Sequence, residues 1–178
     1  MRNKRLRLMA EIGVAVALSA VLGLIKLFHM PQGGSVSLEM LPILIVAIRW
    51  GGITGMLTGI VYGFVQLIID AYVVHPAQFL LDYPIAYMLV GLAGFVMITN
   101  IEDKISSYAK ILAAVLLGGV GRFIAHLLTG VIYFASFAPE GQNVWLYSII
   151  YNGSYILPSI IICYIIIIPV LKPLLKYK

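Results

Sequence analysis

Side chains that could bind a polar molecule are concentrated in a few stretches of an otherwise apolar sequence. They include three histidines, several carboxylates and a group of tyrosines: His29, Glu39, Asp70, Tyr72, His75, Asp82, Tyr83, His126, Glu140, Tyr147, Tyr151 and Asn152. Aromatic rings attract a cation through their π faces, and a carboxylate supplies its counter-charge. Asparagine and histidine can hydrogen-bond the edge of a heterocycle. These residue types favour a site for a small aromatic cation.

The composition places that site in a membrane. Of 178 residues, 62% are hydrophobic and only 11% are charged, whereas soluble domains are about 45–50% apolar. We therefore predict an all-α integral membrane protein with one domain, residues 1–178. The only cysteine, Cys163, has no partner for a disulfide. No serine, cysteine or metal-ligand cluster accompanies His126 at a recognisable spacing, so an enzyme, a cofactor and a metal site are not predicted.

Hydropathy predicts six transmembrane helices, at about residues 6–28, 40–50, 51–72, 78–100, 106–135 and 143–171. Basic residues flank both ends of the chain, and Glu102 and Asp103 mark a loop on the same side. Because cytoplasmic loops carry an excess of lysine and arginine, both termini are predicted to be cytoplasmic. A signal peptide at the N-terminus is the alternative, which Glu11 disfavours. The apolar run 40–48 is short, so either this helix is short or the preceding loop dips into the membrane.

Two spacing patterns, one of glycines and one that includes His126, indicate how the helices pack. Gly51, Gly55, Gly59 and Gly63 recur every fourth residue, which predicts a bare stripe for close helix contact. Arg122, His126 and Gly130 share one helix face. His126 and Asn152 each lie about ten residues, roughly 15 Å, inside the outer end of a helix, so they could face one cavity.

Each polar residue also has a structural interpretation. Arg122 could pair with Asp70 or Asp82 and hold helices together, or it could serve function directly, as ionisable groups at such depth often do. Asp82 could be a solvated helix cap near Pro84. The tyrosines and Trp145 could form an interfacial belt. The combination of carboxylates, aromatic faces and hydrogen-bonding groups favours a binding site.

Five segments together resemble a known family. They are residues 30–35 (MPQGGS), 49–51 (RWG), 75–83 (HPAQFLLDY), 122–126 (RFIAH) with Gly130, and 145–152 (WLYSIIYN). Their order and spacing are similar to those of the thiamine-specific substrate-binding (S) subunit of energy-coupling factor (ECF) transporters, the ThiT or YuaJ family. The resemblance covers nearly the whole chain. It implies a six-helix S-component fold with a thiamin pocket near the outer face, roofed by the loop between the first two helices.

The resemblance also implies roles for individual residues. The acid near the thiazolium would be Asp82, where the best-known members have glutamate. Tyr72 and Tyr83 would be aromatic contacts, and His126 would lie against the ligand rings. Tyr147 and Asn152 would hydrogen-bond the aminopyrimidine. The other expected site residues are Glu39 after the roof loop, Gly130 in the helix motif, and Ser35 and Phe134, where some members have tryptophan.

In that family, partner subunits complete the transporter. The resemblance implies a transmembrane coupling subunit and two ATPase subunits, because this chain carries no nucleotide-binding motif. The coupling subunit would dock on Gly13 and Ala17, or on a pair beginning at Ala17. The expected location is the prokaryotic cell membrane, with multiple passes through the lipid bilayer and no nucleic-acid partner. An S component for another vitamin and a stand-alone cation-coupled carrier are the alternatives.

Overall fold

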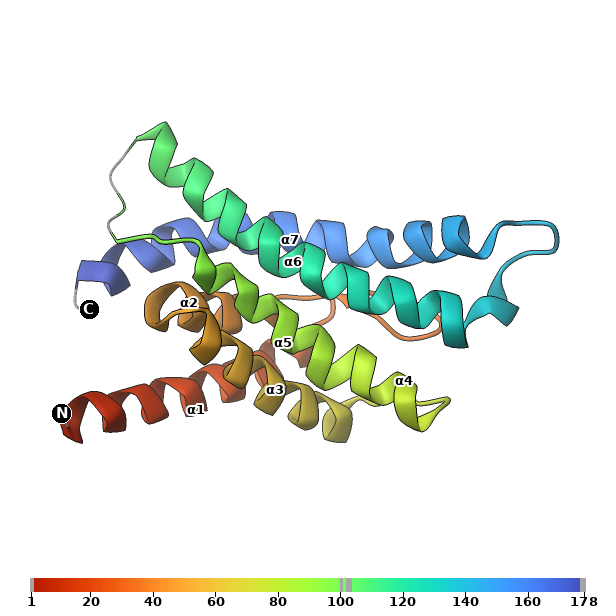
Figure 1. Cartoon of the computed structure of the whole chain (residues 1–178), viewed down its shortest axis with the longest axis horizontal. Coiled ribbons are helices and arrows are strands. Elements are labelled where there is room, and N and C mark those ends of the chain that lie inside the picture. Colours follow the sequence, from red (N-terminus) through yellow and green to blue (C-terminus); the bar gives the residue numbers. More distant parts are fainter. Residues whose placement is uncertain (1, 100, 102–103, 177–178) are drawn as a thin grey trace.

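Long helices make up most of the structure, a computed structural model that describes residues 2–99, 101 and 104–176 (Figure 1). Five helical segments are long and apolar enough to cross a membrane: Asn3–Leu24 within α1 (Arg2–Leu24), Gly52–Ile69 (α3), Pro76–Phe95, Ile105–Tyr133 (α6) and Val144–Leu175 within α7 (Val144–Lys176). A sixth helix, α2 (Met40–Trp50), is apolar but shorter. The prediction of an all-helical membrane protein is confirmed.

Both termini lie at the same end of the helix bundle (Figure 1). We refer to this as the terminus end, and to the other as the opposite end. An even number of crossings requires this arrangement. The side of the membrane that each end faces stays a prediction. Asn100, Glu102, Asp103 and Lys178, to which the predicted topology also refers, lie outside the described residues.

The segment between α1 and α2 differs from the prediction. The first helix ends at Leu24 and not at residue 28, and a small antiparallel hairpin follows. Its strands are β1 (Phe28–His29) and β2 (Ser35–Val36). The turn between them uses Gly33 and Gly34 at φ of 83° and 89°, a backbone region that suits glycine because it has no Cβ. We call residues 25–39 the hairpin loop.

The fourth predicted helix is a composite rod. It begins at Pro76 with α4 (Pro76–Leu80), continues as a π-helical segment, η1 (Leu81–Ile85), and then as α5 (Ala86–Val90). It finishes as a 3-10 segment, η2 (Gly91–Phe95), five residues before the predicted end. Pro84 has no N–H to donate, and the wider π turn accommodates that gap. This irregular segment carries Asp82.

Glycines let α3 pack closely on that rod, as the sequence pattern predicts. A Cβ at Gly59 would overlap the carbonyl group of Tyr87, and one at Gly63 would lie 2.5 Å from Cα of Pro84. The backbones therefore touch directly, which places η1 firmly against α3. Gly51 does not belong to this stripe, because it forms the turn between α2 and α3.

The outer faces of the helices remain apolar. In the four later candidate spans, 39% to 44% of the residues in an apolar 18-residue stretch are buried inside the protein. In the corresponding stretch of α1 only 17% are buried. Gly13 and Ala17 lie on the exposed side of α1. A helix with so little intramolecular cover needs lipid or another protein along most of its surface.

Candidate functional site

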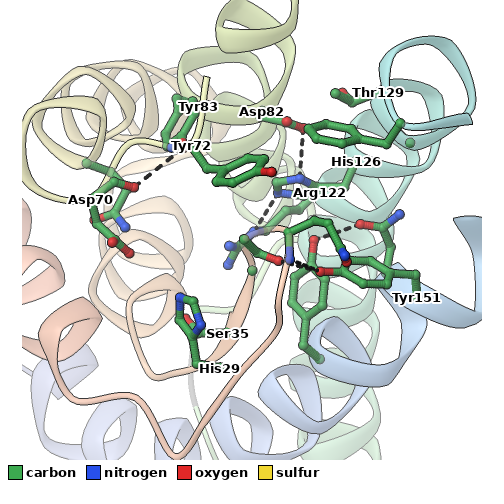
Figure 2. Close-up of a pocket in the computed structure, with 18 of the residues that line it drawn as sticks. His29, Ser35, Asp70, Tyr72, Asp82, Tyr83, Arg122, His126, Thr129 and Tyr151 are labelled. Carbon is green, nitrogen blue, oxygen red and sulfur yellow. Dashed lines mark hydrogen bonds and ion pairs between the residues drawn. The ribbon is translucent and has the colours of Figure 1, made fainter. Parts of the chain in front are cut away.

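A cavity of about 200 Å³ is shown in close-up in Figure 2, and the start of α7, which lines it, lies at the opposite end of the bundle (Figure 1). The hairpin loop, the end of α3, the composite rod, the second half of α6 and the start of α7 enclose it. Every ligand contact predicted from the sequence lines it: Ser35, Glu39, Tyr72, Asp82, Tyr83, His126, Gly130, Phe134, Tyr147 and Asn152. His29, Gln66, Asp70, Tyr87, Arg122, Ser148, Tyr151 and Tyr155 are also in the lining.

A buried ion pair forms the base of the cavity. Nη2 of Arg122 lies 2.7 Å from Oε1 of Glu39, and both side chains are almost fully buried. Tyr62 lies 2.9 Å from the other Glu39 oxygen, and Nη2 of Arg122 also donates to the Tyr87 hydroxyl. The Arg122 guanidinium is thus the counter-charge of the buried Glu39 carboxylate. The predicted partners of Arg122, Asp70 and Asp82, are both wrong.

Asp82 has two polar neighbours, Gln78 and His126. Its Oδ2 accepts a 2.6 Å hydrogen bond from Gln78, and its Oδ1 lies 2.9 Å from Nδ1 of His126. Nε2 of His126 accepts a 3.3 Å hydrogen bond from Nε of Arg122. Arg122, His126 and Asp82 thus form one continuous chain of polar contacts at the cavity (Figure 2).

The cavity has one carboxylate that no strong base neutralises. Glu39 pairs with Arg122, and Asp70 pairs with Lys26 at 2.5 Å. Among the residues that the structure describes, Asp82 has no lysine or arginine partner, and its hydrogen bond and its ion-pair contact are with Gln78 and His126. Three carboxylates and one arginine line the cavity, a formal charge of −2 with histidines counted as neutral, and Lys26, outside the lining, compensates Asp70 and leaves −1. Such a cavity favours a monovalent cation, because a buried charge is stable only when it is paired.

Aromatic rings form one side of the cavity. The Tyr72 ring lies 5.9 Å from that of Phe134, which in turn lies 6.0 Å from Phe137. The Tyr83 hydroxyl accepts from the backbone N–H of Tyr72 at 2.6 Å, so Tyr83 holds the loop that carries Tyr72. These faces can attract a cation or stack on a flat heterocycle.

The start of α7 forms the other side. The amide of Asn152 donates to the carbonyl and hydroxyl oxygens of Ser148, and its oxygen accepts from Tyr155 at 2.7 Å. One lone pair of that amide oxygen remains to accept a hydrogen bond from a ligand. A Cβ at Gly130 would overlap the Ser148 hydroxyl. Gly130 thus allows α6 and α7 to approach at the cavity.

The hairpin loop covers the cavity and is fastened to α7. The Tyr151 hydroxyl accepts from the backbone N–H of Gln32 at 2.9 Å and donates to the carbonyl of Gly33 at 3.1 Å. A Cβ at Gly34 would lie 2.7 Å from the Tyr155 ring. The role of Tyr151, which sequence left open between ligand contact and interfacial belt, is in part to hold this loop.

Sequence reasoning missed the role of Gln78. This side chain is buried; its amide donates to Asp82 and to the Tyr72 carbonyl, and its oxygen accepts from the Val74 N–H. Gln78 lies four residues, about one helical turn, before Asp82, and this spacing could have indicated that the two side chains interact. The two tryptophans, Trp50 and Trp145, do not line the cavity, and Trp145 is exposed, as an interfacial residue would be.

The cavity offers binding groups without a metal centre. Within residues 2–99, 101 and 104–176, no cluster of three or more histidine, cysteine or carboxylate side chains is placed to hold a metal ion. What the arrangement provides is one uncompensated negative charge, aromatic faces and a few hydrogen-bonding groups. That combination suits reversible capture of a small, flat organic cation.

Known proteins are similar to this chain in sequence and in fold. The family model described as "Thiamine transporter protein (Thia_YuaJ)" matches residues 9–178. A thiamine transporter ThiT from Bacillus subtilis (strain 168) is 37% identical over 174 residues, covering 93% of this chain and 91% of the relative. One from Lacticaseibacillus paracasei is 29% identical, covering 93% and 87%. The solved structure of ThiT from Listeria monocytogenes superposes with a TM-score of 0.83 at 26% identity, covering 97% of this chain and 98% of that one.

Proposed function

The chain belongs to the thiamine transporter family, and from that premise we propose that it captures thiamin from outside the cell in the cavity beneath the hairpin loop. The family consists of transporters and not of enzymes. The observation that carries the proposal is the uncompensated charge of Asp82 among aromatic side chains. Thiamin carries one permanent positive charge, on its thiazolium ring, and so supplies the charge that the lining lacks.

The two rings of thiamin would take different sides of the cavity. The thiazolium lies near Asp82, against the faces of Tyr72 and Phe134, where a carboxylate and aromatic rings both stabilise a cation. The aminopyrimidine lies toward α7, where the free lone pair of the Asn152 oxygen accepts from its amino group and Tyr147 lies alongside. His126 contacts the ligand between them. Glu39, paired with Arg122, stabilises the cavity without touching the ligand charge directly.

Transport requires partners that this chain does not contain. We propose that it is the S component of an ECF transporter in a prokaryotic cell membrane, where a coupling subunit and two ATPase subunits drive release of thiamin inside. The sparse burial of α1 supports docking on the face that carries Gly13 and Ala17. In this arrangement the ATPases supply the energy and the present chain supplies the specificity.

The direct test is isothermal titration calorimetry of the purified protein with thiamin, riboflavin and biotin. Calorimetry is preferable to tryptophan fluorescence because neither tryptophan lines the cavity. We expect saturable one-to-one binding of thiamin and none of the other two. Binding of riboflavin or biotin instead would make the chain an S component for another vitamin.

Uptake by vesicles distinguishes an S component from a stand-alone carrier. Vesicles that contain only this chain should bind thiamin without accumulating it. Accumulation driven by an ion gradient, with no coupling module present, would show a stand-alone carrier and contradict the ECF assignment.

A further inference from the structure

Gln66, near the end of α3, has a polar group that the complex with thiamin described above does not use. The residue lines the cavity, although only 7% of it is exposed. Oε1 of its amide lies 2.9 Å from the Tyr62 hydroxyl. No residue in the described part of the chain accepts a hydrogen bond from Nε2. Because buried polar groups in proteins are nearly always hydrogen-bonded, the cavity is the place from which a partner of Nε2 can come.

The contact with Tyr62 sets which end of the amide faces the cavity. A Cβ at Gly23, on α1, would lie 2.8 Å from the Tyr62 hydroxyl and 3.4 Å from Oε1 of Gln66. Oε1 therefore faces Tyr62 and the backbone of α1. The oxygen and the nitrogen of an amide project in different directions from the same carbon, so Nε2 is the end that is left to face the cavity.

Gln66 lies on the side of the cavity that is away from α7. The backbone N–H of Asp70 donates to the Gln66 carbonyl at 2.9 Å, and Tyr72 follows two residues later. Figure 2 shows Asp70 and Tyr151, which belongs to α7, on opposite sides of the cavity. In the proposed complex the aminopyrimidine lies toward α7 and the thiazolium lies against Tyr72. Gln66 is therefore on the thiazolium side.

The thiazolium ring of thiamin carries an ethyl chain that ends in a hydroxyl group. Asp82 matches the charge of the ligand and Asn152 matches its amino group, but neither is assigned to this hydroxyl. A hydroxyl both donates and accepts, so it pairs with either end of an amide. We propose that Gln66 binds the hydroxyl of thiamin and makes the cavity selective for it. This inference rests on the proposed function and adds a residue that determines specificity.

The test is calorimetric titration of the purified full chain with thiamin and with its ethyl analogue, in which a hydrogen atom replaces the hydroxyl. We expect the parent protein to bind thiamin about tenfold more tightly, since the analogue leaves a buried N–H without a partner. Gln66→Met keeps the length of the side chain and removes the amide. In this variant the preference should fall to about twofold or less, while the ethyl analogue binds at least as tightly as it does to the parent.

A matched control deletes a different amide. Gln78 holds Asp82 and does not line the cavity, so Gln78→Met should weaken both ligands by the same factor and leave the preference unchanged. If Gln66→Met does not fold, Gln66→Asn withdraws the amide by one methylene group and should lower the preference in the same way.

The outcomes separate this inference from the function on which it rests. An unchanged preference in the folded Gln66 variant would overturn the assignment of the hydroxyl, and so would equal binding of the two ligands by the parent. Failure of the parent to bind thiamin at all would instead contradict the proposed function.

Discussion

Asp82 is the residue on which we expect cation binding to depend most. Replacing it with asparagine keeps the size of the side chain but removes the charge that lies beside Gln78 and His126. We expect Asp82→Asn to weaken thiamin binding by about 2–4 kcal/mol, or roughly 30- to 1,000-fold, because the ligand cation would then be buried without a counter-ion. Calorimetric titration measures this directly.

Two further variants show whether the charge itself is responsible. Glu140→Gln makes the same chemical change outside the cavity lining and should bind thiamin like the parent. Asp82→Glu keeps the charge and should retain most of the affinity. If Asp82→Asn binds as tightly as the parent protein, the cation is neutralised elsewhere.

Gln78 positions that carboxylate. In Gln78→Met the Asp82 oxygen loses its 2.6 Å donor, and the Val74 N–H loses its acceptor. We expect thiamin affinity to fall by about 1.5–3 kcal/mol, the usual contribution of a hydrogen bond to a charged group. The matched variant Gln142→Met, outside the cavity lining, should have no such effect. A lower unfolding temperature with unchanged affinity would limit Gln78 to a structural role.

Individual site residues were largely predictable, but their partners were not. The spacing of Arg122 and His126 and the depth of Asn152 placed these side chains at one cavity, since helical periodicity is a local property of the sequence. Glu39, which pairs with Arg122, is 83 residues away. No periodic pattern connects such distant positions, so the sequence did not distinguish Glu39 from Asp70 and Asp82 as the partner of Arg122.

The hairpin loop covers the cavity, and we expect it to limit the exchange of ligand. The Tyr151 hydroxyl makes two hydrogen bonds to its turn. Removing them in Tyr151→Phe should loosen the turn and speed thiamin dissociation by about 3- to 10-fold, since each hydrogen bond contributes about 0.5–1.5 kcal/mol. Stopped-flow displacement measures the rate, and hydrogen exchange of residues 31–36 should also increase.

A hydroxyl deletion in the same helix provides the control. Tyr164 donates to the Tyr108 carbonyl, away from the cavity. Tyr164→Phe should leave both the dissociation rate and the exchange of the hairpin loop unchanged. Slower or unaltered dissociation in Tyr151→Phe would show that the loop is held by other contacts.

The secondary structure of the site was harder to predict than the helices around it. Apolar runs located the long helices to within a few residues. The hairpin was missed because its strands are two residues each, too short to show an alternating pattern. The π-helical segment at Asp82 was missed because Pro84 near a helix start reads as an ordinary first-turn proline. Both irregular elements contact the ligand cavity.

Of the candidate membrane spans, the one in α1 is the least buried inside the protein. If its exposed face docks the coupling subunit, bulky residues at Gly13 and Ala17 should block the approach of a partner helix. We expect Gly13→Phe/Ala17→Phe to bind thiamin normally, to lose copurification with the coupling subunit and to abolish uptake in cells. Ile53→Phe, an equally exposed change on α3, should leave assembly intact. Normal assembly of the double variant would move the docking surface elsewhere.

The ion pair between Glu39 and Arg122 also bears on how the chain is made. Ribosomes add about 5–20 residues per second, so the 83 residues between the two side chains correspond to a delay of about 4–17 s. During that interval Glu39 enters the membrane region without its cation, and an unpaired carboxylate there is costly. We therefore expect the first three helices to reach their final packing only after α6 has been synthesised.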